Sequence, residues 1–188
     1  FNYIPWNMRR PILADLRVRK ALAHAMDLEA FVQTVAHGLA KLPTGPQCYF
    51  GNAYDHDVVR LGFDPERALA LFAEAGWYDR DGDGLVDQGG QPLAIELLVP
   101  DKSVSGLAYG QKLQEDLGRL GVALTLVPRD QPVFFKQVYE RDFDAAHLAW
   151  FMPVESDPEQ IWHSRWVGHH TSNHGSFADP GADRLIDA

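Results

Sequence analysis

The spacing of apolar residues divides the chain into two parts. Before residue 90, apolar residues recur at intervals of three and four, as on one face of an α-helix. Three helices are expected there, each beginning at an aspartate N-cap: 16–26 after Asp15, 28–38 after Asp27 and 65–76 after Asp64. The residues expected on their inner faces are Leu16, Leu22, Ala25, Met26, Phe31, Val32, Val35, Leu69, Leu71 and Phe72. Residues 39–63, rich in Pro, Gly, Asn and Tyr, predict a long irregular connection.

After residue 90 the pattern alternates between short apolar runs and helical periodicity. Strands are expected at 93–99, 122–127 and 143–150, with helices at 104–120 and 132–139 between them and a last helix after Asp179. The order βαβαβ predicts an α/β fold with a parallel sheet flanked by helices. Residues 1–188 are expected to form a single lobe, with a helical and turn-rich half at 1–90 and the βαβαβ half at 91–188.

Ligands of such sheets bind beyond the carboxyl ends of the strands. The third strand ends in Trp150, Phe151, Met152 and Pro153, which offer apolar and aromatic surface to a crevice. The ends of the other two strands carry Asp101 and Asp130. An α/β enzyme domain with a site at Asp101, Asp130 and Trp150 is therefore an open alternative.

Composition and charge narrow the class of protein. The chain has 188 residues, with 17 basic and 26 acidic side chains and a net charge of −9. This charge repels phosphate backbones and anionic lipids, so no nucleic-acid partner and no membrane-surface attachment are expected. The start of the chain shows no signal peptide, and its last helix lacks a stop signal, so we expect a fragment of a longer protein.

The sequence contains no catalytic signature. Glycine-rich nucleotide loops, GxSxG and HExxH are all absent, and the lone Cys48 has no base beside it. Ser103 or Ser105 is expected to cap a helix rather than to act as a nucleophile. We therefore predict that the protein is not an enzyme.

Two clusters of polar residues raise the question of a metal. Asp79, Asp81, Asp83 and Asp87 resemble the first half of a calcium loop, but the twelfth position is Gly90 where a bidentate Glu is needed. An acidic surface turn is preferred, with Ca²⁺ as an alternative. The second cluster consists of loop histidines, His163, His169, His170 and His174, whose spacing matches no closed zinc pattern. No cofactor is predicted.

Several short runs follow one another in a distinctive order. They are Asn7 with DLRVRKALAxAMD at 15–27, DPExA at 64–68 with AGW at 75–77, DLxxLGV at 116–122, FD at 143–144 before the strand ending at Trp150, and DP at 157–158 with Asn173 and DxLI at 183–186. With the Asp-Gly-Asp-Gly turn, this series resembles the bacterial extracellular solute-binding proteins of family 5, the oligopeptide- and dipeptide-binding components of ABC importers.

The resemblance implies a lobe like those of type II periplasmic binding proteins, here most of the carboxy-terminal lobe. In this family two lobes joined by strands close over the solute like a hinge. Members are receptors that act without catalysis. They are exported to the periplasm, or held outside the membrane by a lipid anchor, and deliver solute to an ABC transporter permease. A monomeric receptor is expected.

The resemblance also implies site residues. Trp150, Phe151, Met152 and Pro153 take cleft-lining positions, and Tyr3 and Trp6 lie near the expected hinge strand. Peptide-binding members carry an acidic residue, where this chain has Pro153, that holds the peptide amino group. An Arg that can meet the peptide carboxylate is replaced by His147. A peptide is the first expectation, and a sugar, a modified peptide or a metal complex remains open.

Overall fold

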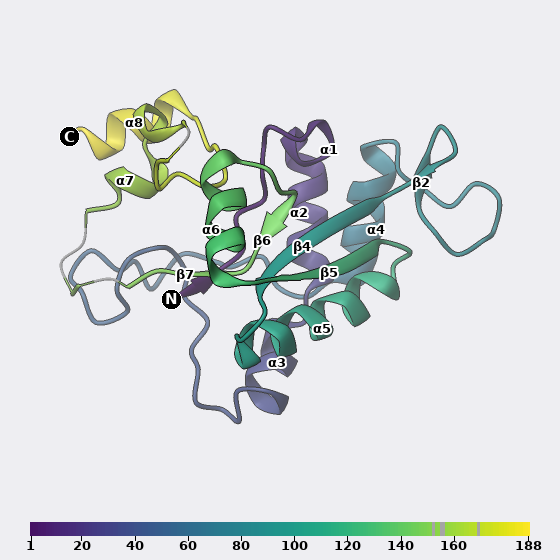
Figure 1. Cartoon of the computed structure of the whole chain (residues 1–188), viewed down its shortest axis with the longest axis horizontal. Coiled ribbons are helices and arrows are strands. Elements are labelled where there is room, and N and C mark those ends of the chain that lie inside the picture. Colours follow the sequence, from purple (N-terminus) through teal and green to yellow (C-terminus); the bar gives the residue numbers. More distant parts are fainter. Residues whose placement is uncertain (152, 155–156, 169) are drawn as a thin grey trace.

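The structure is a computed structural model that describes residues 1–151, 153–154, 157–168 and 170–188. In chain order the elements are β1 (Asn2–Tyr3), α1 (Pro11–Ala14), α2 (Leu16–Ala25), α3 (Leu28–Thr34), α4 (Pro65–Glu74), β2 (Asp87–Gln88), β3 (Gln91–Pro92), β4 (Ala94–Pro100), α5 (Val104–Gly118), β5 (Ala123–Arg129), α6 (Gln131–Glu140), β6 (Ala145–Ala146), β7 (Leu148–Ala149), α7 (Glu159–Trp162), the 3-10 helix η1 (Ser164–Trp166) and α8 (Pro180–Ile186). Figure 1 shows their arrangement. Within the described residues, each helix is too short or too polar to cross a bilayer.

The main sheet has three parallel strands in the order β5-β4-β6. The central strand β4 pairs with β5 along its whole length, from Ala94 opposite Ala123 to Pro100 opposite Arg129. Helix α5 connects β4 to β5, and α6 connects β5 to β6. The predicted βαβαβ order and the α/β class are confirmed.

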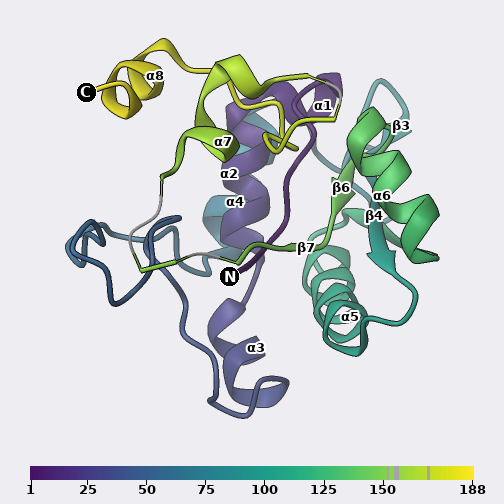
Figure 2. The same ribbon diagram turned by 60° about the vertical axis from the view of Figure 1, so that its left-hand side comes forward.

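Both faces of this sheet carry buried side chains, although Glu96 of β4 and Thr125 of β5 are exposed. Ile95, Leu97 and Val99 of β4 enter a core that α2, α4 and α5 complete. Leu98 points to the other face and packs with residues of α6 such as Phe134. Helices α2 and α4 lie side by side against the first face (Figure 2).

The expected aspartate caps are confirmed. The carboxylates of Asp15, Asp27, Asp64 and Asp179 each accept a backbone N–H from the first turn of the following helix. The prediction that Leu16 and Leu69 lie on the inner faces of their helices is wrong. Leu16 is 53% exposed and Leu69 is 43% exposed. The buried stripe of α2 begins at Val18 and that of α4 at Ala68, so both leucines lie off the face that packs.

The expected third strand at 143–150 is not continuous. Ala145–Ala146 form β6 in the parallel sheet, whereas Leu148–Ala149 form β7, which pairs antiparallel with β1. The break falls at His147, whose backbone N–H still donates to the Leu98 carbonyl at 2.9 Å. The segment at the start of the chain follows the strand across this break, because Trp6 bridges to Ala145 and Tyr3 pairs with Leu148. Figure 1 shows the N-terminus beside β7.

Asn7 fixes the segment between β1 and α1. Its side chain is fully buried, and its Nδ2 donates to the carbonyls of Arg141 at 3.0 Å and Phe143 at 2.7 Å. Its Oδ1 accepts the Arg9 N–H at 3.1 Å. One amide therefore ties the start of the chain to the loop that precedes β6.

Candidate functional site

A short two-stranded ribbon passes through the candidate site. We call the paired residues 1–3 and 148–150 the ribbon. β1 pairs Asn2 with Ala149 and Tyr3 with Leu148. The Trp150 N–H extends the pairing by donating to the Phe1 carbonyl at 2.8 Å. The ribbon thereby places Tyr3, His147 and Trp150 close together in space although the sequence separates them.

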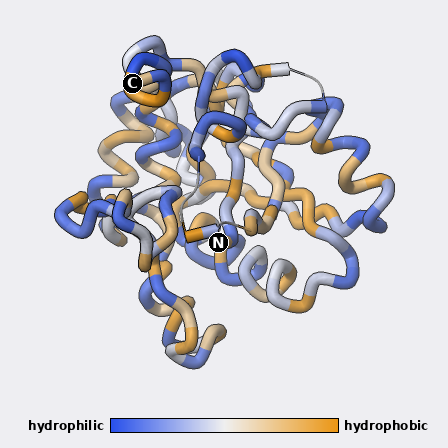
Figure 3. Tube along the Cα trace, turned by 90° about the vertical axis from the view of Figure 1, so that its left-hand side faces the viewer, coloured by the Kyte–Doolittle hydropathy of each residue, from blue (hydrophilic) through white to orange (hydrophobic). Residues whose placement is uncertain are grey.

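A cavity of about 650 Å³, the inner pocket, opens beside the ribbon. One wall is Phe1–Tyr3, and a second consists of α3 side chains, including Phe31. Residues of the 39–63 connection form a third wall, and Ser105 and Tyr109 of α5 close the pocket together with His147. Its size lies in the range of small-molecule sites. Figure 3 shows apolar stretches, in orange, extending into the α3 protrusion at the bottom of the view.

At the α5 side of the inner pocket, His147 and Tyr109 lie beside the exposed Ser105. The His147 side chain is buried, and burial holds its pKa below the ordinary value for histidine. Burial also raises the pKa of Tyr109 to about 12. The Tyr109 ring lies between the rings of His147 and Phe31, with centroid distances of 5.6 and 4.8 Å. At neutral pH both groups are therefore uncharged.

A second cavity of about 300 Å³, the outer pocket, lies on the other side of Lys41. It is lined by Trp150 and Phe151 together with Tyr49 and Cys48, and it shares Phe1, Lys41 and Pro43 with the inner pocket. Phe151 is 96% exposed. The Lys41 ammonium stands 4.0 Å from the centre of the Tyr49 ring.

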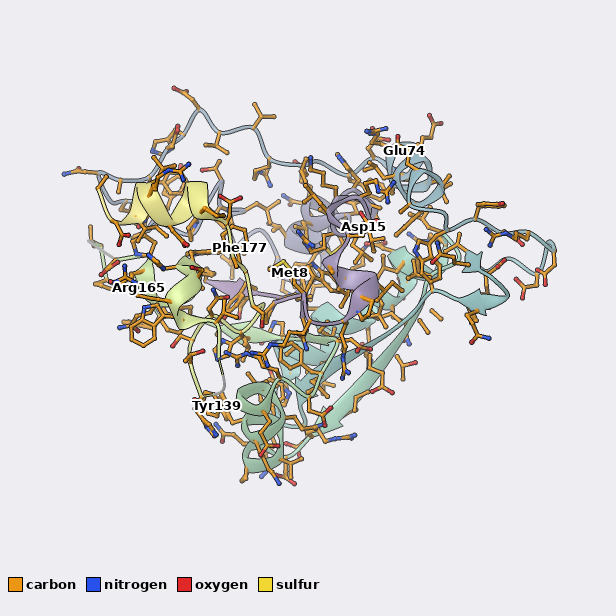
Figure 4. All side chains as sticks on the ribbon, turned by 90° about the horizontal axis from the view of Figure 1, so that it is seen from above. Met8, Asp15, Glu74, Tyr139, Arg165 and Phe177 are labelled. Carbon is orange, nitrogen blue, oxygen red and sulfur yellow. The ribbon has the colours of Figure 1, made fainter. Side chains whose placement is uncertain are left out.

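Trp6 lies elsewhere. It lines a third pocket of about 330 Å³ with Trp162, and Met8 and Phe177, labelled in Figure 4, line the same cavity. Tyr3 borders both this pocket and the inner one. Its hydroxyl lies 3.1 Å from Nδ1 of His174, and burial raises the pKa of Tyr3.

The remaining expected site residues are not gathered in these pockets. Pro153 is exposed and lines none of the three pockets, and Met152 lies outside the described residues. Asp130 caps α6 by accepting the Val133 N–H at 3.0 Å, which gives the carboxylate a structural role. Asp101 is exposed.

The possible metal ligands are arranged as follows. The carboxylates of Asp79, Asp81 and Asp83 lie within 4.8 Å of one another, and all three are exposed. They accept backbone N–H groups of their own turn, as an acidic turn requires. Asp87 lies apart from them and pairs with Arg80 at 2.7 Å.

The described histidines of this cluster do not form a metal-ligand group, although His170 and His174 both contact the Tyr139 ring. His163 faces the carboxylates of Asp183 and Asp187, both at 3.4 Å, and His170 stacks on Tyr139. His174 pairs with Tyr3, and His169 lies outside the described residues. Within the part of the chain that the structure describes, the three aspartates form the one group with metal-ligand spacing.

Sequence reasoning missed most of the inner pocket. Its walls include Lys41, Leu42, Val58, Val59 and Leu61 from the irregular connection. A run of apolar residues in a segment without periodicity was the available signal. The Val59 side chain is 91% exposed, as expected for an apolar residue on a binding surface.

The fold and the pockets define a class of protein. The solved structure of the oligopeptide-binding protein AppA from Bacillus subtilis, in complex with a nonapeptide, matches with a TM-score of 0.92 and 26% identity over 100% of this chain and 38% of that chain. NikZ from Campylobacter jejuni, in complex with Ni(L-His), shares the fold with a TM-score of 0.87 and 21% identity over 100% of this chain and 38% of its own. The chain therefore has the α/β lobe of a type II periplasmic binding protein.

Residues 1–170 match the family described as "Bacterial extracellular solute-binding proteins, family 5 Middle", and the chain belongs to this family. The curated oligopeptide-binding protein AppA of Bacillus subtilis (strain 168) is 28% identical over 195 residues, covering 99% of this chain and 35% of that protein. This chain thus spans about a third of the length of such relatives. Family members are periplasmic or extracellular solute-binding proteins rather than enzymes. The resemblance seen in the sequence is confirmed.

Proposed function

We propose that this chain forms one lobe of the substrate-binding component of an ABC importer, which binds an oligopeptide or similar solute between two lobes. The exposed apolar surface around the pockets carries the proposal. Phe151 in the outer pocket is 96% exposed, and Val59 in the inner pocket is 91% exposed. Apolar groups gathered around cavities need a partner surface, which a bound solute and a second lobe provide.

The rest of the proposal follows from this role. The receptor works as a monomer in the periplasm, or outside the membrane on a lipid anchor, and passes solute to a membrane permease. In this role the receptor carries out no catalysis, and Asp130, a candidate for the alternative enzyme site, is used as a helix cap. Trp150, Phe151, Tyr3 and His147 contact the solute. Closure of the two lobes excludes water from it.

The test uses the complete receptor. Mass spectrometry of small molecules that co-purify with it identifies solute candidates, and each candidate is scored by thermal stabilisation. A ligand at one hundred times its Kd stabilises the folded state by about 2.7 kcal/mol. Phe151→Ala should weaken binding, whereas Leu69→Ala, exposed at 43% on α4 and outside the lining of both pockets, should not. Equal stabilisation of the isolated 188-residue chain would contradict a two-lobe site.

A second candidate is a receptor of the same family for a non-peptide solute. Pro153 and the uncharged His147 favour it, because neither provides the charge that binds a free peptide terminus. Titrating the complete receptor with a peptide, an oligosaccharide and a nickel–histidine complex distinguishes the two candidates.

A further inference from the structure

A buried carboxylate on α5 joins this helix to the start of α3. Asp116 is 3% exposed, and three donors surround its carboxylate. Lys112 bonds both carboxylate oxygens, and Arg119 Nη1 lies 3.2 Å from Oδ1. These two cations compensate the charge, as a buried carboxylate requires. The third donor is the backbone N–H of Asp27, 3.1 Å from Oδ2, which comes from a distant part of the chain.

Asp27 is the residue at which α3 begins. Its own carboxylate caps α3 by accepting the Ala30 N–H at 2.9 Å, while its backbone N–H is held by Asp116. Met26 and Asp27 are the whole link between α2 and α3. The direction in which α3 leaves α2 is therefore decided at the residue that Asp116 holds.

α3 contacts α5 at a second point. The Phe31 ring meets the Tyr109 ring edge to face, with centroids 4.8 Å apart. Tyr109 and Asp116 lie on one face of α5, about two turns or about 10 Å apart along the helix axis. A ring contact tolerates sliding, whereas a hydrogen bond is directional. The Asp116 bond therefore sets the angle of α3, which protrudes from the rest of the chain (Figure 2).

This angle matters because the inner pocket lies beside α3. Leu28, Phe31 and Val32 form one wall of the pocket, and Tyr109 of α5 lies in another. A rotation of α3 about the Phe31–Tyr109 contact would move Leu28 relative to α5. The width of the pocket would change with it.

We propose that Asp116 is a positioning residue of the solute site. Through the Asp27 N–H it holds α3 at the angle that gives the inner pocket its shape, and it lies outside the lining of the pocket. Its effect on solute affinity rests on the proposed solute-binding function. Its effect on the placement of α3 does not, so the two are measured separately.

The variants remove the acceptor without leaving a buried charge unpaired. In the complete receptor, Lys112→Met is the control, because Asp116 then keeps Arg119 and the bond to Asp27. Lys112→Met with Asp116→Leu removes the acceptor, and replacement of both members of a buried ion pair by apolar side chains is often tolerated. Lys112→Met with Asp116→Asn restores an acceptor of the same size.

Pulsed EPR measures the position of α3. Spin labels on cysteines at the exposed positions Gln33 of α3 and Glu115 of α5, in a Cys48→Ser background, report the distance between the two helices. The distance distribution should be preserved in the control and in the asparagine variant, and shifted or broadened in the leucine variant. An unchanged distribution in the leucine variant overturns the proposal.

Hydrogen exchange covers the case in which the leucine variant does not fold. In the unmodified receptor the Asp27 N–H should exchange at least about tenfold more slowly than its intrinsic rate, because it is bonded to Asp116. Exchange at the intrinsic rate would mean that the bond does not hold α3, and it overturns the proposal.

Solute affinity is measured on the same receptors as the concentration of a random nonapeptide pool that gives half-maximal retention. Loss of the acceptor should raise this concentration roughly 2- to 30-fold, the effect of residues that act through others, and the asparagine variant should restore it. Equal retention by all variants despite a displaced α3 overturns the positioning role. If the unmodified receptor retains no peptide, peptide binding itself is contradicted, and EPR alone decides the placement of α3.

Discussion

Replacing Asn7 by alanine should destabilise the chain more than any change of an exposed asparagine. Asn7→Ala removes three hydrogen bonds, two to the carbonyls of Arg141 and Phe143 and one from the Arg9 N–H. The Phe143 carbonyl keeps one bond, from Arg10 Nε at 3.2 Å. At about 1 kcal/mol for each lost bond, with the Phe143 partner partly compensated, we expect a loss of about 2–3 kcal/mol.

The assay is urea unfolding of the chain, followed by tryptophan fluorescence and by circular dichroism. For a domain of this length the loss corresponds to a fall in Tm of about 4–12 °C. Asn52 is exposed, and Asn52→Ala should change stability by less than about 0.5 kcal/mol.

A third variant tests the direction of the hydrogen bonds. Asn7→Asp keeps the shape of the side chain but replaces the donor with an acceptor that faces two carbonyls. It should be at least as destabilising as Asn7→Ala. Wild-type stability in Asn7→Asp would refute the reasoning, because the amide donors would then contribute nothing.

Further predictions concern α5, the buried histidine and the acidic turn. Gly106→Ala should destabilise the chain by about 1–3 kcal/mol, because its Cβ would lie 2.9 Å from His147 Nδ1 and 2.7 Å from Ser103 Oγ. Gly118→Ala, in the same helix with nothing within 4 Å, should instead stabilise it by up to about 1 kcal/mol, as urea unfolding will show. Burial, aided by Arg141, lowers the pKa of His174 to about 4 from 6.5, so the unfolded state binds a proton first as the pH falls. Stability should drop between pH 6.5 and about 4 by up to about 3 kcal/mol, and His174→Gln should reduce this slope in unfolding measured across that range. Calcium or EDTA should leave the Tm unchanged, because the Asp79, Asp81 and Asp83 carboxylates already accept backbone N–H groups; a calcium-dependent rise would contradict this.

Local chemistry made several elements predictable from the sequence. The carboxylates of Asp15, Asp27 and Asp64 cap helices by accepting backbone N–H groups two or three residues later. A short stretch of sequence therefore contains every residue that forms the cap. Strand β4 was recognisable because its apolar residues Ile95, Leu97, Leu98 and Val99 follow one another closely and are buried on the two faces of the sheet.

The remaining features depend on contacts between distant residues. The break at His147 exists because β7 pairs with a strand at the other end of the chain, and no pattern near residue 147 records that partner. Among the candidate residues, Tyr3 and His147 share the inner pocket, and Trp150 and Phe151 share the outer one. Trp6 was separated from them because its backbone bridges to Ala145 and its side chain lies in the third pocket.

The ribbon links the two pockets mechanically, because Phe1 lines both the inner and the outer pocket. The Phe1 carbonyl accepts the N–H of Trp150, and the Trp150 side chain lines the outer pocket. A group that enters the inner pocket and contacts Phe1 therefore also acts on a wall of the outer pocket. Amide exchange at Trp150 should slow when the inner pocket is filled.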